Sequence, residues 1–266
     1  MSEAFFIVLT FFVSIGASVL SGMAGGGSGF VVAPYFILIG LPPNLATATA
    51  KMNEVGVNAS SILAMYRVRK RALVTDTGTV ITTATAASSN REVFFAGLLL
   101  VTMINVALAA WLIPNLQADG MQYIIAGLLL IMIPTLFMDK KTLKPGYRSK
   151  KWKRSGYIVY SIVSFFQALF GMGIGMFVSM VLMYMFGIPV AAANDLKRRL
   201  MIIQAVVLTV LLLMQGTVVI SLGIAALAGA LIGGHIGTVI GVKKGGTFIK
   251  KIMAGVMGIS AISILL

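Results

Sequence analysis

Four polar residues stand at helical spacing within a mostly apolar stretch of the sequence: Lys51, Glu54, Asn58 and Ser61. Steps of three and four residues place side chains on one face of a helix. A charge at the centre of a membrane-embedded helix costs about 2.5–3.5 kcal/mol on insertion scales, so such residues are functional candidates by default. Because ammonium and carboxamide groups donate hydrogen bonds, this face predicts a site for a small oxyanion.

A second stretch repeats part of this pattern. Residues Ser21–Arg71 align without a gap on residues Gln167–Thr217, at a constant shift of 146 positions. Lys51 then falls on Lys197, Asn58 on Gln204 and Pro43 on Pro189. The repeat predicts a duplicated unit that supplies one lysine and one carboxamide from each half.

Glycine clusters precede both lysines, with the sequences GGGSG and GMGIG. Glycine ends helices and allows close approach of backbone, so each cluster predicts a broken helix with exposed amide groups. The short apolar segments that follow, Phe30–Gly40 and Met176–Gly187, predict half-helices whose N-terminal ends favour an anion. Close helix packing is the alternative explanation for the glycines. The substrate-binding candidates are Gly25, Gly26, Gly27, Ser28, Gly29, Lys51, Asn58, Gly171, Gly173, Gly175, Lys197 and Gln204.

Two acidic residues lie close to these lysines. Glu54 and Asp195 are candidates for proton coupling, because an ionisable group inside a membrane often carries protons. The alternative is neutralisation within a helix: Glu54 follows Lys51 by three residues, and Asp195 precedes Arg198 by three.

Composition indicates the class of protein that positions these residues. Hydrophobic residues make up 59% of the chain, charged residues 11%, and the mean hydropathy is +1.00. These values predict an all-α polytopic membrane protein with about 8–10 membrane segments. We place Leu73–Asn90 at an interface or against protein, because it is rich in hydroxyl groups. The expected spans are Ala4–Leu20, Leu45–Tyr66, Val93–Ile113, Met121–Met138, Ser155–Phe170, Leu200–Met214, Val218–Val242 and Thr247–Leu266.

Most of the positive charge lies in short loops between these spans, although the net charge is +14. This distribution follows the positive-inside bias and places the RVRKR segment and the basic stretch 139–154 in the cytoplasm. Both termini are then expected outside, and the two halves are expected to be inverted. The predicted units are repeats over residues 1–138 and 155–266, with 139–154 as linker. No aromatic or glycine pattern accompanies the basic residues, which argues against nucleic-acid binding.

Several other classes of site are disfavoured. The chain contains no cysteine and one histidine, His235, so no metal site is expected. Ser28 stands where a phosphate-binding loop requires lysine. No catalytic set can be assembled from seven acidic residues and one histidine, so we expect neither an enzyme nor a bound cofactor.

The segments GMAGGGSGFVVAPYFILIGLPPNLATATA and GMGIGMFVSMVLMYMFGIPVAAAN resemble the two signature copies of the TauE/SafE sulfite-exporter family. The C-terminal segment from Gly229 resembles the glycine-zipped helices of that family. The resemblance implies transport of sulfite, sulfoacetate or a related sulfur compound across the cytoplasmic membrane. It places the substrate region at 25–29, 46–49, 171–175 and 192–195, which adds Thr47, Thr49 and Asn194 to the candidates.

We therefore expect a secondary transporter for a small sulfur oxyanion or organosulfonate. It would work by alternating access of two inverted halves, and export is the expected direction. An anion channel and a non-transporting accessory subunit are the alternatives. The expected partners are the anionic substrate, the lipid bilayer and a second copy of the chain.

Overall fold

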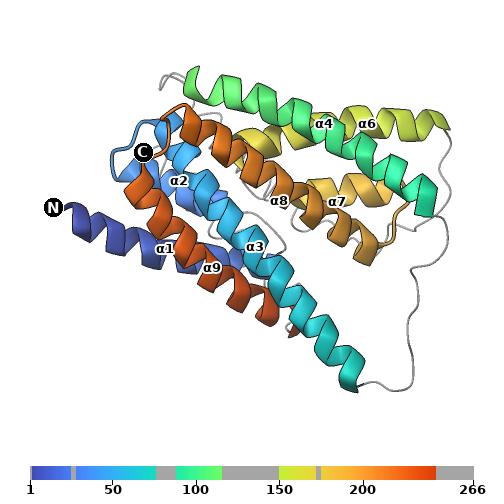
Figure 1. Ribbon diagram of the computed structural model, residues 1–266, viewed down its shortest axis with the longest axis horizontal. Coiled ribbons are helices and arrows are strands. Elements are labelled where there is room, and N and C mark those ends of the chain that lie inside the picture. The colour runs from blue at the N-terminus through green and yellow to red at the C-terminus, as the bar shows by residue number, and fades with distance from the viewer. Residues whose placement is uncertain (1, 25–27, 76–87, 116–149, 172–174, 244–266) are drawn as a thin grey trace.

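The computed structural model describes residues 2–24, 28–75, 88–115, 150–171 and 175–243, and all regular structure in these ranges is helical (Figure 1). The predicted spans Met121–Met138 and Thr247–Leu266, and most of Leu73–Asn90, lie outside these ranges. The helices are α1 (Glu3–Ala24), α2 (Gly29–Leu38), α3 (Pro43–Thr75), α4 (Ser88–Asn115), α6 (Lys150–Phe170), α7 (Gly175–Tyr184), α8 (Val190–Met214) and α9 (Ile220–Lys243).

Among the described residues, three helices are long and apolar enough to cross a membrane, by length and composition: Glu3–Met23, Phe94–Asn115 and Ile220–Gly241. The outer face of α4 carries exposed Leu100, Ile104, Leu108 and Trp111 at steps of three and four residues. An exposed apolar stripe of this kind suits contact with lipid. The prediction of an all-α polytopic membrane protein is confirmed.

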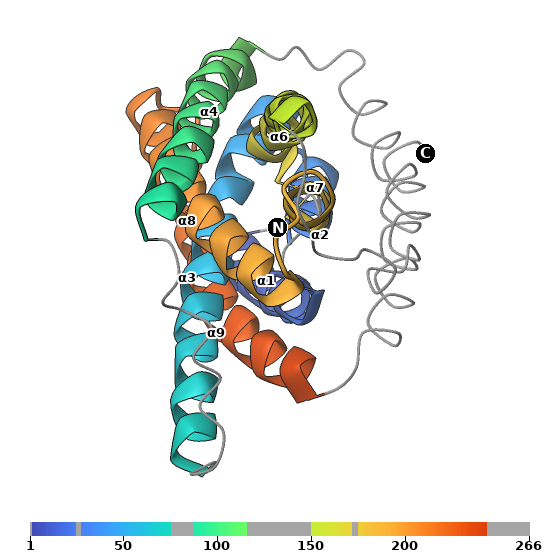
Figure 2. The same ribbon diagram turned by 90° about the vertical axis from the view of Figure 1, so that its right-hand side faces the viewer.

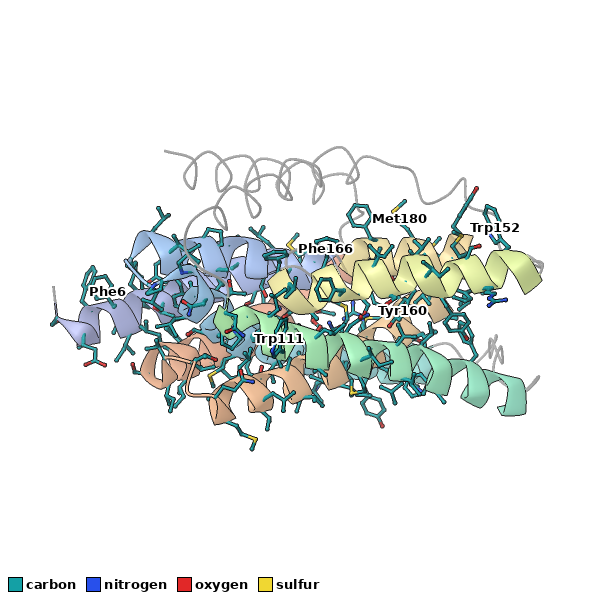
Figure 3. The ribbon with its side chains drawn as sticks, turned by 90° about the horizontal axis from the view of Figure 1, so that it is seen from above. Phe6, Trp111, Trp152, Tyr160, Phe166 and Met180 are labelled. Carbon is teal, nitrogen blue, oxygen red and sulfur yellow. The ribbon has the colours of Figure 1, made fainter. Side chains whose placement is uncertain are left out.

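The helix bounds follow the repeat in the sequence. α2 covers residues 29–38 and α7 covers residues 175–184, so both of their ends differ by the same 146 positions. The shift also carries α1 onto α6 and α3 onto α8 to within a few residues at their starts. Figure 3 shows Phe6 of α1 and Trp152 of α6 at opposite ends of the molecule. α3 and α8 also run in opposite directions (Figure 1). These opposite helix directions support an inverted repeat. The orientation of its two halves in a membrane stays a prediction.

α2 and α7 are half-helices that fold back along the helices before them. The Thr10 hydroxyl of α1 lies 3.0 Å from the Tyr35 hydroxyl of α2. Trp152 of α6 likewise donates to the Tyr184 carbonyl of α7 at 3.4 Å. Each half-helix has ten residues, too few to cross a bilayer of about 30 Å upright. Figures 1 and 2 show α2 and α7 nearly in line, both starting near the middle of the molecule.

The described helices form two groups, each of which contains one helix from the other half of the chain. α9 packs with α1, α2 and α3, whereas α4 packs with α6, α7 and α8. The first core comprises Ala17, Val32, Ala33, Phe36, Ala46, Ala50, Leu222 and Ala226. The second comprises Leu98, Tyr160, Val178, Val181, Leu182, Met183, Phe186, Ala193 and Leu200. A third cluster joins α3 and α4 to α6 and α8, so the two groups share a packed centre.

Glycines on one face of α9 set its distance from α1. Gly229, Gly233, Gly237 and Gly241 recur every four residues. A Cβ atom at any of these positions would overlap backbone atoms of α1. Glycine is therefore required for this close crossing, a use of small residues that is common between membrane helices. The crossing agrees with the glycine-zipped C-terminal helices that the sequence resemblance implies.

Candidate functional site

Lys51 and Glu54 form a buried ion pair in the first half of α3. The Lys51 Nζ atom lies 3.1 Å from Glu54 Oε2, and the two side chains are only 2% and 10% exposed. The pair uses a three-residue step on one helix face. Glu54 therefore supplies a counter-charge for Lys51, which was one of the two roles that the sequence left open for it.

Gln167 of α6 completes this cluster. Its Nε2 atom donates to Glu54 Oε1 at 2.7 Å, and its backbone carbonyl accepts from Lys51 Nζ at 3.4 Å. These bonds tie α3 to the last turn of α6, immediately before the second glycine break. Gln167 is not one of the site residues predicted from the sequence. Its only signal there was its position in the repeat, four residues before Gly171.

Gly171 places the glycine break directly against this cluster. Its φ angle is +62°, a conformation that glycine adopts without steric cost. A Cβ atom at Gly171 would lie 2.6 Å from Glu54 Oε2. The Glu54 carboxylate therefore lies directly against Gly171, and the predicted anion cradle itself stays a prediction.

The first glycine break reaches the same region. Gly29, the first residue of α2, packs so closely that an added Cβ atom would lie 3.0 Å from the Phe170 carbonyl oxygen. Ser28 precedes it and is almost fully buried, and its hydroxyl has no hydrogen-bond partner in the described part of the chain. Gly25, Gly26, Gly27 and Gly173 lie outside the described residues.

The hydroxyl and amide candidates on α3 differ in their surroundings. The Thr47 hydroxyl is buried and has no partner within the ranges that the structure describes. Thr49 accepts a hydrogen bond from the Val219 backbone amide at 3.1 Å and so ties α3 to the start of α9. Asn58 is buried one turn beyond Glu54. The Thr49 hydroxyl is therefore already engaged in a contact between helices.

Candidates in the second half mainly connect helices. The Ser179 hydroxyl of α7 donates to Asn194 Oδ1 at 3.0 Å, and the Gln204 amide donates to the Ser164 carbonyl at 3.2 Å. Gly175 is buried at the start of α7, Lys197 is buried at 2% exposure, and Asp195 is partly buried. The repeat places buried Leu200 at the position of Glu54, so the second half lacks that carboxylate.

The cluster contains hydrogen-bond donors of the kind that suit an anion. The Lys51 ammonium carries three N–H groups, and its bonds to Glu54 and Gln167 leave one available within the described ranges. Gln167 adds a neutral amide donor. No group of three or more His, Cys, Asp or Glu residues that could hold a metal ion occurs in the part of the chain that the structure describes.

Membrane-length helices and two broken helices that meet at a buried charged cluster define this protein as a membrane transporter. The family model for the sulfite exporter TauE/SafE matches residues 9–264, and the chain belongs to that family. It is 26% identical over 250 residues to a probable membrane transporter protein of Haemophilus influenzae, covering 93% of this chain and 89% of the relative. It is 23% identical over 257 residues to the probable membrane transporter protein YfcA of Escherichia coli K12, covering 96% and 88%. No solved structure matches the chain.

Proposed function

We propose that the protein is a secondary transporter that exports a small sulfur oxyanion or organosulfonate, such as sulfite or sulfoacetate. The main observation in support of this proposal is that the Lys51 ammonium is buried at the glycine break and hydrogen-bonded to a carboxylate. A carboxylate and a sulfonate both present oxygen acceptors that share negative charge, so the contacts that hold Glu54 also suit the substrate. Membership of the sulfite-exporter family supports the choice of sulfur oxyanions.

The transport mechanism that we propose is alternating access of two inverted halves. Broken helices in matching positions of both halves are typical of transporters with a central binding site. α2 and α7 both start near the middle of the molecule and run away from each other, which supports the mechanism (Figure 1). Rocking of one helix group against the other would open the cluster to each side in turn.

The proposed location is the cytoplasmic membrane, with several spans, both termini outside and the basic segment 139–154 inside. Basic loops are retained in the cytoplasm, which supports this orientation. An interior-negative potential favours outward movement of an anion by about 2.3 kcal/mol per charge per 100 mV. Export of an anion that crosses with net negative charge therefore requires no other energy source. We propose that the protein is a transporter and not an enzyme.

Ligand-induced stabilisation of the detergent-purified protein tests the substrate class. A ligand that binds only the folded state at about 100 times its Kd stabilises that state by about 2.7 kcal/mol. We expect sulfite, sulfoacetate and thiosulfate to raise the melting temperature, and acetate and phosphate to raise it much less at equal ionic strength. Equal shifts with all five anions would contradict selectivity for sulfur oxyanions. No shift with any of them would contradict the binding site.

A further inference from the structure

The Glu54 carboxylate holds the contacts that the proposed function assigns to the substrate. Lys51 Nζ approaches one of its oxygen atoms at 3.1 Å, and Gln167 Nε2 approaches the other at 2.7 Å. The missing side chain of Gly171 provides the space in which the carboxylate lies. A cation, an amide donor and a glycine gap are the groups that the proposed function requires for an oxyanion. The site is therefore filled by an anionic group of the protein itself.

The second half has no matching acid. Its lysine, Lys197, is followed three residues later by Leu200, where the first half has Glu54. Leu200 is 1% exposed and belongs to the apolar core of its helix group. The carboxylate is thus absent from the equivalent position of the second half, and Glu54 is the acid that the described residues place at Lys51.

Within the residues that the structure describes, two side chains hydrogen-bond to the Glu54 carboxylate. They are Lys51 on its own helix and the neutral Gln167 on α6. The other titratable side chains that the structure places are Glu3 on α1, Tyr35 on α2, Tyr66 and Arg67 on α3, Arg154, Tyr157 and Tyr160 on α6, Tyr184 on α7, Asp195, Lys197, Arg198 and Arg199 on α8, and His235 on α9.

We propose that Glu54 is a built-in competitor of the substrate, and that it leaves Lys51 by taking up one proton when the anion binds. This inference rests on the proposed function. Two negative groups cannot both remain ionised at one buried cation without a large repulsion, so the arriving anion favours the protonated carboxyl. The proton comes from the aqueous phase on the loading side and returns to water when the anion leaves.

The proposed exchange makes each anion move together with one proton. A doubly charged anion then carries one net negative charge, so the membrane potential still drives it outward. A singly charged anion moves without net charge, and its own gradient and the pH difference determine its direction. Protonation of Glu54 therefore determines how much net charge crosses the membrane with each anion, and hence how strongly the membrane potential drives transport.

Proton counting on the wild-type protein tests this inference. Thiosulfate is the probe, because its charge does not change between about pH 5.5 and 8. Titration calorimetry in buffers with different ionisation enthalpies gives the number of protons taken up per bound anion. We expect this number to approach one, and the affinity to fall up to about tenfold per unit rise in pH.

Two variants and one control locate the proton. Glu54→Gln should bind thiosulfate more tightly than wild type, with no proton uptake and no pH slope, whereas exposed Glu3→Gln should behave as wild type. If the pH dependence of thiosulfate affinity were lost in Asp195→Asn but kept in Glu54→Gln, the assignment of the proton to Glu54 would be overturned. Thiosulfate binding without proton uptake by the wild type would overturn the inference and leave the proposed function standing. Failure of the wild type to bind any sulfur oxyanion would instead count against the proposed function. The wild-type proton count decides the inference even if Glu54→Gln does not fold.

Discussion

Glu54→Leu is expected to lower the free energy of unfolding by about 3–5 kcal/mol, because it leaves Lys51 charged and buried without its partner. The substitution copies the second half, where Leu200 stands at the equivalent position. It also removes the acceptor of the Gln167 amide, which is 2.7 Å from Glu54 in the wild type. The measurement is reversible unfolding in mixed detergent micelles, followed by circular dichroism.

The double variant Lys51→Met with Glu54→Leu separates stability from binding. Replacing both members of a buried pair by apolar residues of similar volume is often neutral or stabilising. The unsatisfied Gln167 amide should leave a deficit of about 1–3 kcal/mol. The double variant should therefore be more stable than Glu54→Leu and should not bind thiosulfate. Near-wild-type stability of Glu54→Leu alone would show that the pair is not buried as described.

Gly233→Ala combined with Gly237→Ala is expected to destabilise the contact between α1 and α9 by up to about 4 kcal/mol. Each new methyl group overlaps backbone atoms of α1, at Ile15 and Val19 respectively. Overpacking costs up to about 3 kcal/mol at each site, and the higher helix propensity of alanine returns about 1 kcal/mol. The overlap outweighs the gain in helix propensity because a backbone atom cannot move aside without moving its helix. The same unfolding titration measures the effect.

Gly16→Ala is the matched control for this double variant. Gly16 lies on α1, and an added Cβ atom at this position would have no atom within 4 Å. Only the gain in helix propensity, up to about 1 kcal/mol, remains, so the control should be as stable as wild type or slightly more stable. If the double variant were as stable as Gly16→Ala, the close crossing of α1 and α9 would be wrong.

Local signals made the broken helices predictable from the sequence. The glycine clusters placed the half-helices at Phe30–Gly40 and Met176–Gly187, and the structure has α2 at 29–38 and α7 at 175–184. Glycine and proline act on the backbone next to them, so the positions of these breaks depend little on tertiary contacts. The packing of α9 with the helices of the first half, and of α4 with those of the second half, could not be predicted, since it depends on which helices meet after folding.

The site was predictable only in part. Charge in an apolar span and a three-residue step identified Lys51 and Glu54, because both signals are local. Gln167 lies 113 positions from Glu54 and has no distinctive spacing, so only the fold shows that it donates to the carboxylate. Gln204 was selected by the same reasoning as Asn58, yet its amide binds the Ser164 carbonyl. A polar donor is easier to identify from the sequence than the acceptor to which that donor binds in the folded protein.

Counterflow of radiolabelled sulfite in liposomes tests the central claim, that the protein is a carrier for a small sulfur oxyanion. We predict saturable uptake that rises when unlabelled sulfite is loaded inside, and that is lost in the Lys51→Met, Glu54→Leu double variant. Uptake that increases linearly without saturation, together with single-channel currents, would contradict a carrier and indicate a channel. Uptake no greater than in protein-free liposomes would contradict transport of sulfite and favour an accessory role.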